Sequence, residues 1–234
     1  MKRFTLAVGL CLSALTVSLA AQETFGASPA KPEVQTRESQ AAMTPSSALE
    51  RLKEGNARFV SNAMKRRDWS AKVVATASGQ FPYAAILACM DSRAPIEVVF
   101  DQGLGDVFGV RVAWNVVNQD ELGSLEYAVK VGTKLIVVLG HTSCGAVKGA
   151  IDGVKLGNLT SLLAKLHPAV AAANCRSSTD DACVTKVAEM NVRQSMQEIR
   201  ERSPYLKKYL DQVRVGLVGG IYDVATGKVT FLEN

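Results

Sequence analysis

The sequence predicts an α/β fold: a mostly parallel central sheet flanked by helices, with an antiparallel strand at its C-terminal edge. Short, continuous apolar runs such as Ile86–Ala88 and Leu135–Leu139 are typical of strands buried on both faces of a parallel sheet. Segments whose apolar residues recur at helical spacing separate these runs. Near the end of the chain, Ala225-Thr226-Gly227-Lys228 predicts a turn into a last strand over Val229–Leu232.

The elements can be predicted in order along the chain. Thr44-Pro45-Ser46-Ser47 indicates a helix start, with Ser46 or Ser47 as the N-cap. The apolar residues that follow have helical spacing, at Leu49, Leu52, Phe59 and Val60. The remaining elements are a strand over 83–88, a strand within 106–113, a helix over 122–131, a strand over 135–139 and a strand over 213–222.

The chain divides into three parts. Residues 1–21 have the pattern of a secretory signal peptide, with Lys2 and Arg3 before an apolar stretch and Ser18-Leu19-Ala20 as the cleavage site. Residues 22–43 are polar and lack hydrophobic periodicity, which predicts a disordered linker or an arm ordered only against a partner. Residues 44–234 are expected to form one globular domain.

The signal peptide predicts a periplasmic or otherwise secreted protein with no stable membrane span after cleavage. Its removal takes away Lys2 and Arg3, which lowers the net charge from +5 to +3, because all 22 acidic residues lie beyond it. This mild excess, without a basic stripe and interleaved aromatic residues, argues against a nucleic-acid partner.

Two short motifs carry the chemistry: Cys89-Met90-Asp91-Ser92-Arg93 and His141-Thr142-Ser143-Cys144. Each follows an apolar run, and the strand ends of an open α/β sheet meet at one crevice. Two thiolates, an imidazole and a carboxylate are ligands that zinc prefers, which favours a metal site of Cys89, Asp91, His141 and Cys144. A disulfide between the two cysteines, or plain burial of each, would leave the nearby His141 and Asp91 unexplained.

On the basis of these motifs, the chain resembles the β-class carbonic anhydrases. The resemblance rests on the paired Cys-x-Asp-x-Arg and His-x-x-Cys motifs and on four stretches around them. These are Leu49-Glu50-Arg51-Leu52-Lys53-Glu54-Gly55-Asn56, Gly123-Ser124-Leu125-Glu126-Tyr127-Ala128-Val129, Gly140-His141-Thr142-Ser143-Cys144-Gly145-Ala146-Val147 and Ile221-Tyr222-Asp223. Together they cover essentially all of residues 45–234.

The resemblance implies the reversible hydration of carbon dioxide to bicarbonate and a proton, with one zinc ion per subunit. It makes Cys89, His141 and Cys144 the zinc ligands. Asp91 either becomes a fourth ligand or pairs with Arg93, which would open the fourth position to water. Zinc-bound hydroxide would then attack carbon dioxide with help from the Asp91–Arg93 dyad.

The resemblance also implies a substrate pocket and an oligomer. Gln80 matches an amide that donates to substrate oxygen, Phe108 and Tyr127 match an aromatic wall, and Ala113 matches a small apolar contact. A homodimer or homotetramer is expected, with the helix over 49–60 reaching across to its partner. Trp114 departs from the family, in which many members have a small residue, and could narrow the pocket or pack at a subunit boundary.

Two other interpretations of the zinc motifs imply a different function from carbon dioxide hydration. A structural zinc module would use the same ligands but would need no dyad, because structural sites are closed. A relative with the same fold could hydrolyse another small molecule such as carbon disulfide. An assay of carbon dioxide hydration separates all three.

The remaining cysteines of the predicted mature chain are Cys175 and Cys183. They flank a polar stretch that is predicted to be an exposed loop, which favours a disulfide in an oxidising compartment. The alternative is two independent cysteines, one buried and one exposed. His167, the only histidine besides His141, precedes Pro168 and is expected at the surface.

Overall fold

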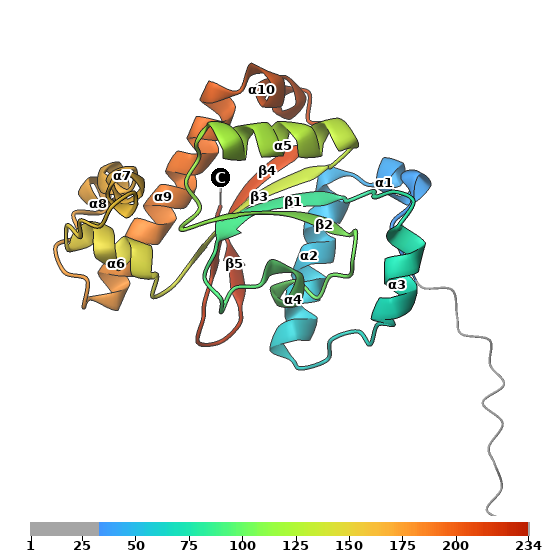
Figure 1. The fold of residues 1–234 in the computed structure, drawn as a ribbon, viewed down its shortest axis with the longest axis horizontal. Coiled ribbons are helices and arrows are strands. Elements are labelled where there is room, and N and C mark those ends of the chain that lie inside the picture. The colour runs from blue at the N-terminus through green and yellow to red at the C-terminus, as the bar shows by residue number, and fades with distance from the viewer. Residues whose placement is uncertain (1–32, 234) are drawn as a thin grey trace, which may run out of the picture. The chain divides into compact units, whose positions relative to one another are not determined.

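A five-stranded sheet forms the centre of the fold in the computed structural model, which describes residues 33–233 (Figure 1). The strands are β1 (Ala84–Cys89), β2 (Val107–Val112), β3 (Leu135–His141), β4 (Gly216–Tyr222) and β5 (Val229–Phe231). They lie in the order β2-β1-β3-β4-β5, with the first four parallel and β5 antiparallel to β4 at the edge. The predicted fold class is therefore confirmed.

Helices cover both faces of this sheet, which explains why β1 and β3 are buried along their whole length. One face packs against α5 (Gln119–Val131) and α9 (Asp181–Arg202), and α10 (Pro204–Asp211) lies against both helices. The other face packs against α2 (Pro45–Val60) and α4 (Ile96–Val99) (Figure 1). Each face buries its own apolar cluster, so the continuous apolar strands of the sequence are stabilised from two sides.

Helix α2 begins two or three residues earlier than predicted, because its N-cap is neither Ser46 nor Ser47. The N-cap is Thr44, whose hydroxyl accepts from the Ser47 N–H, while Pro45 occupies the first helical position. Proline fits there because that position has no intrahelical N–H partner to lose. Further along, the Asn56 amide donates to the carbonyls of Val99 and Gly227 and accepts from the Val229 N–H, which ties α2 to α4 and β5.

The N-terminal arm corrects one prediction. Residues 37–42, expected to be part of a disordered linker, form helix α1 (Arg37–Ala42), capped by Thr36. The Gln40 side chain is buried and donates to the Pro82 carbonyl, so a polar segment without periodicity is held by a capping box and one tertiary hydrogen bond. The predicted signal peptide at 1–21 and the start of the predicted linker lie outside the described residues.

Smaller differences concern element boundaries and helices that the patterns did not predict. Helix α5 starts at Gln119 rather than Leu122, because Asn118 caps it through the N–H groups of Asp120 and Glu121. Strand β4 starts at Gly216, since the backbone at Val213 is left-handed (φ 54°). The other helices are α3 (Trp69–Thr76), α6 (Gly145–Ile151), α7 (Leu159–Ala164) and α8 (His167–Ala173). Between residues 33 and 233, no helix is both long and apolar enough to span a bilayer.

The strand order creates a crevice between β1 and β3. These strands are neighbours, but the chain leaves β1 towards β2 on one side and leaves β3 towards β4 on the other. At such a switch point the connecting segments diverge, which opens a crevice beyond the carboxyl ends of the two strands. Cys89 and His141, the last residues of β1 and β3, lie at this crevice.

Candidate metal centre

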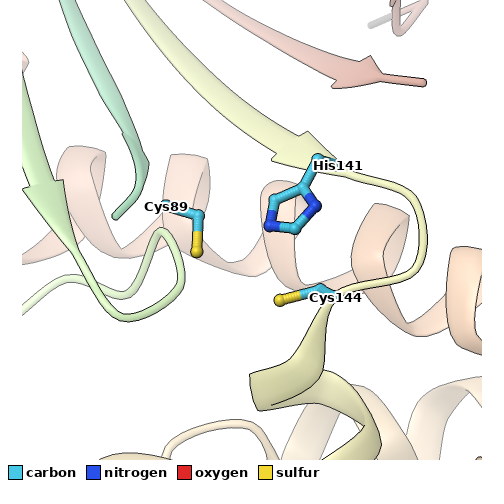
Figure 2. Close-up of side chains that lie close together, drawn as sticks. All are labelled: Cys89, His141 and Cys144. Atoms are coloured by element: carbon cyan, nitrogen blue, oxygen red, sulfur yellow. The ribbon is translucent and has the colours of Figure 1, made fainter. Parts of the chain in front are cut away.

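Three side chains from separate segments converge at the crevice. Cys89 comes from the end of β1, His141 from the end of β3, and Cys144 from the N-cap position of α6. Figure 2 shows their donor atoms turned towards one another, and these atoms all lie within 4.8 Å of each other. Two thiolates bound to one tetrahedral zinc ion at about 2.3 Å lie about 3.8 Å apart, so small side-chain adjustments suffice for these donors to share a metal.

The imidazole of His141 is prepared for metal binding. Its Nδ1 lies 2.9 Å from the Thr142 carbonyl, which can only accept, so Nδ1 carries the hydrogen and Nε2 keeps a lone pair. This Nε2 is buried and has no hydrogen-bond partner among the described residues. A buried acceptor without a partner is costly, and a metal ion at the centre of the three donors would satisfy it.

Each of the two thiols shifts the pKa of the other. The hydrogen bond from the Cys144 thiol lowers the pKa of Cys89, and burial acts in the opposite direction. The same hydrogen bond, together with burial, raises the pKa of Cys144, and the N–H groups of Val147 and Ala146 offset only part of this. The pair therefore titrates as a unit, and a divalent cation would replace its remaining proton.

Asp91, the fourth predicted ligand, lies beside the three donors and is held by Arg93. Its Oδ1 accepts from the main-chain N–H and Nε of Arg93 at 2.8 and 3.0 Å, and its Oδ2 accepts from Nη2 at 2.8 Å. These hydrogen bonds lower the pKa of Asp91 to about 2. Its Oδ2 still lies 3.8 Å from His141 Nε2, so the carboxylate borders the metal position without belonging to the converging set.

Two further residues hold this dyad in place: Arg111, which the sequence patterns did not single out, and Tyr222, which they include only within the family-like stretch Ile221-Tyr222-Asp223. Arg111 on β2 donates from Nε to the Cys89 carbonyl (3.0 Å) and from Nη2 to the Asp91 carbonyl (2.8 Å). The Tyr222 hydroxyl, at the end of β4, donates to the Arg93 carbonyl at 3.2 Å. The contacts themselves depend on the strand register, because both residues act on main-chain carbonyls of a segment distant in sequence.

Comparisons with known proteins agree with this geometry. A family model described as carbonic anhydrase matches residues 84–229, which is more than half of the 234 residues and includes all three donors. Among solved structures, one of two tetrameric β-carbonic anhydrases from Sordaria macrospora superposes with a TM-score of 0.63 at 25% identity, covering 70% of this chain and 91% of that one. The chain belongs to the β-class carbonic anhydrase family.

Curated carbonic anhydrases support the same assignment. Carbonic anhydrase 2 of Mycobacterium tuberculosis is 50% identical over 117 residues, which is 49% of this chain and 56% of the relative, so this match spans only about half of each protein. The carbonic anhydrase of Mycolicibacterium smegmatis is 35% identical over 201 residues, covering 79% of this chain and 92% of the relative.

The predicted substrate pocket of a carbonic anhydrase is not assembled within one chain. Phe108 pairs with Ala85 on β1, four residues before Cys89, which places it about 13 Å from the metal end of the sheet. The Tyr127 ring on α5 packs against Phe108, with 6.0 Å between centroids. Gln80 is exposed and precedes β1, farther still from the donors. Of the four predicted pocket residues, only Ala113 lies at the metal end, directly after β2.

Trp114 was expected either to narrow the pocket or to pack at a subunit boundary, and the structure excludes the boundary. The indole is fully buried within one chain, so it does not lie at a subunit boundary. It packs beside His141, with 5.8 Å between ring centroids, and shares the apolar cluster of Cys89 and Cys144. His167, at the start of α8, is exposed as predicted.

The second cysteine pair is bonded. Cys175 and Cys183 form a disulfide with 5.4 Å between their Cα atoms, which confirms the predicted pairing over two independent cysteines. It links the segment after α8 to the first turn of α9. Cys89 and Cys144 are free and buried.

Proposed function

We propose that this protein is a zinc-dependent carbonic anhydrase that interconverts carbon dioxide and bicarbonate. The observation that carries the proposal is the convergence of Cys89, His141 and Cys144 with Asp91 held to one side by Arg93. A structural zinc site is closed by four protein ligands, whereas a catalytic site keeps one position open. Three donors and a diverted carboxylate match the catalytic arrangement.

The donor set favours zinc among the common metals. Sulfur and imidazole nitrogen suit zinc, whereas calcium and magnesium require oxygen ligands. When bound, zinc would supply the Lewis acidity that makes a water molecule acidic enough for reaction near neutral pH. Cys89, Cys144 and His141 Nε2 would hold it, and the Thr142 carbonyl would fix the orientation of the imidazole.

The role of Asp91 follows from its hydrogen bonds and its pKa. With a pKa of about 2 it stays ionised at neutral pH, so it cannot keep a proton taken from water. It can accept a hydrogen bond from the attacking oxygen and thereby orient a lone pair towards carbon dioxide. Arg93 fixes the carboxylate in a two-point hydrogen bond and is itself tied to the Ser143 carbonyl at 3.3 Å, which links the dyad to the loop that carries Cys144.

A second copy of the chain is the proposed source of the missing pocket residues. Tyr127 is 56% exposed, and an open groove of about 1000 Å³ along β2 and α5 includes Phe108, Val110 and Tyr127. Because one chain separates these aromatic residues from its own metal centre, they can serve catalysis only at the centre of another copy. We therefore propose a homodimer or homotetramer with Gln80, Phe108 and Tyr127 acting across the interface.

Hydration of carbon dioxide, followed by stopped-flow with a pH indicator, tests the activity. The wild type is expected to hydrate carbon dioxide with about one zinc ion per chain, and zinc-loaded protein without activity would contradict the proposal. Carbon disulfide as a second substrate identifies a hydrolase of the same fold.

The variant Tyr127→Asp tests the role of the interface. A buried carboxylate at the interface should dissociate the oligomer and remove activity while zinc stays bound, as measured by light scattering and metal analysis. Val74→Asp on α3 is the matched control, because Val74 is 77% exposed and lies on another element. A fully active monomer of Tyr127→Asp would contradict the shared pocket.

We also infer an oxidising destination for the mature protein. The signal-peptide pattern at residues 1–21 and the Cys175–Cys183 disulfide both support export. Fractionation of cells that produce the full chain should recover it outside the cytoplasm and shortened at its N-terminus. Recovery of the uncut chain in the cytoplasm would contradict this.

A further inference from the structure

Position 114 combines a large buried side chain with an unusual backbone. Trp114 has φ 71°, in the left-handed region that non-glycine residues rarely adopt. Its side chain is nevertheless fully buried, and its indole Nε1 has no hydrogen-bond partner in the described part of the chain. A strained backbone and an unpartnered buried donor each cost stability. Other contacts of the same residue must therefore offset this cost.

The backbone conformation brings the main-chain amide of Trp114 to the metal centre. The chain reverses directly after β2, where Val112 and Trp114 form an isolated antiparallel bridge. In this turn the Trp114 N–H donates to Cys89 Sγ at 3.3 Å, and the Asp91 N–H donates to the same sulfur at 3.4 Å. The two amides fix the Cys89 sulfur from two different segments.

The indole contacts a second donor. Its ring lies 5.8 Å from the His141 ring at an interplanar angle of 50°, a tilted arrangement that aromatic pairs favour. Apart from this packing, the described residues hold the imidazole through one hydrogen bond, from Nδ1 to the Thr142 carbonyl. The indole is kept in place by packing and not by its N–H, because that N–H has no partner.

We propose that Trp114 is a positioning residue of the metal centre. Its amide fixes the sulfur of Cys89 and its ring fixes the plane of His141, so that the donors converge before a metal binds. The inference rests on the proposed zinc function and deepens it, because it assigns to one residue of this chain the preorganisation of two ligands. Because the contact is between the two rings and does not use the indole N–H, phenylalanine should replace the indole in this role.

Zinc affinity of three variants, measured by competition with a chromophoric chelator, tests the proposal. Trp114→Gly removes the ring and relieves the backbone, and should weaken zinc binding by about 10–100-fold, the range for residues that orient ligands. Trp114→Phe should stay within about threefold of the wild type. Trp69→Phe is the control, because Trp69 is 52% exposed on α3 and should leave the affinity unchanged.

The absorption spectra of the cobalt-substituted proteins distinguish a residue that positions the ligands from one that only stabilises the fold. The thiolate-to-cobalt absorption band should shift or weaken in Trp114→Gly and keep its position in Trp114→Phe. Equal zinc affinity and an unchanged band in Trp114→Gly would overturn the proposal, and so would an equal loss in both variants. If the wild type itself bound no zinc, the proposed function would fail instead, so the two failures are distinguishable.

A measurement without any substitution at 114 covers the case in which Trp114→Gly does not fold. The chain has two tryptophans, so Trp69→Phe leaves Trp114 as the single tryptophan, whose emission can be excited apart from that of the tyrosines. Cobalt(II) should quench this emission in proportion to the metal bound, because the indole lies against a ligand. Unchanged emission at full cobalt occupancy would also overturn the proposal.

Discussion

The two cysteine pairs of the described chain have opposite chemistry. Cys175 and Cys183 are close in sequence and form a disulfide, whereas Cys89 at the end of β1 and Cys144 at the N-cap of α6 are distant in sequence and stay free. The first pair closes a polar loop, and the second is buried beside a histidine with an unpartnered nitrogen. The difference teaches that neighbouring groups decide the fate of a thiol: His141 and two main-chain N–H donors surround Cys89 Sγ.

Removal of a donor from the free pair should have the largest effect. Cys89→Ser, His141→Ala and Cys144→Ser should each lose stoichiometric zinc and reduce hydration of carbon dioxide to the uncatalysed rate, because two remaining donors make an incomplete site. Metal analysis and stopped-flow assays measure both effects. The matched control is the double variant Cys175→Ser/Cys183→Ser, which should keep zinc and activity. Full zinc content in purified Cys144→Ser would contradict the assignment of Cys144 as a zinc ligand.

The next effect should come from the dyad beside the free pair. Arg93→Ala removes the two-point hold on Asp91, so zinc should stay bound while activity falls by about 100-fold, the size expected when a reacting group is misplaced. Arg93→Lys should recover part of the rate, because lysine keeps the charge but not the two-point geometry. Near-wild-type turnover in Arg93→Ala would show that Arg93 is only structural.

The pH dependence of activity shows which group titrates at this site, a water molecule or the Asp91 carboxylate. Activity should increase from mildly acidic to mildly alkaline pH as water loses a proton, and Asp91 should not contribute because its pKa is about 2. A profile measured by stopped-flow at constant ionic strength tests this. A flat profile between mildly acidic and mildly alkaline pH would count against the mechanism.

The bonded pair should affect stability and not catalysis. The double variant Cys175→Ser/Cys183→Ser should lower the free energy of unfolding by roughly 2–3 kcal/mol, because a closed loop of this length restricts the unfolded chain. Urea titration of oxidised wild type and variant measures this. Mass spectrometry of non-reduced, zinc-stripped wild type should find one link between 175 and 183 and two free thiols. Four alkylatable cysteines in protein from an oxidising compartment would contradict the comparison.

The smallest effect concerns acid stability at the dyad. The folded pKa of Asp91 lies below its ordinary value of 3.8, so its ionised form stabilises the fold above about pH 4, and this contribution disappears as the pH falls through about 2. Half-exposed Arg93 limits the contribution to under about 1 kcal/mol. The unfolding free energies of wild type and Arg93→Ala should therefore converge as the pH falls from 4 to 2. A constant difference over this interval would exclude ionisation of Asp91 as the cause.

Much of the fold and the three metal donors could be predicted from the sequence. Strands buried on both faces leave continuous apolar runs, and the ends of such runs identified Cys89 and His141 before any contact was known. Cys144 followed because its side chain lies three residues beyond His141 on the same loop. The disulfide was predictable for the same reason, since both cysteines border one short loop.

Other features depended on contacts between distant segments. Helix α1 is held by a buried glutamine against Pro82, and Arg111 donates to carbonyls at the end of the neighbouring strand β1 and just beyond it. Neither partner can be read from local periodicity, because hydrogen bonds to main-chain carbonyls place no constraint on the residue type of the acceptor.

The sequence by itself therefore determined the class of sheet, the three converging donors Cys89, His141 and Cys144, and the Cys175–Cys183 pair, because each follows from local patterns or from motifs shared with the family. Only the tertiary structure decided that Asp91 faces Arg93, that Trp114 is buried against His141, and that Phe108 lies far from its own metal centre. The physical reason is that strand order, register and a left-handed turn set these distances. Each of them results from the packing of segments that are remote in the chain.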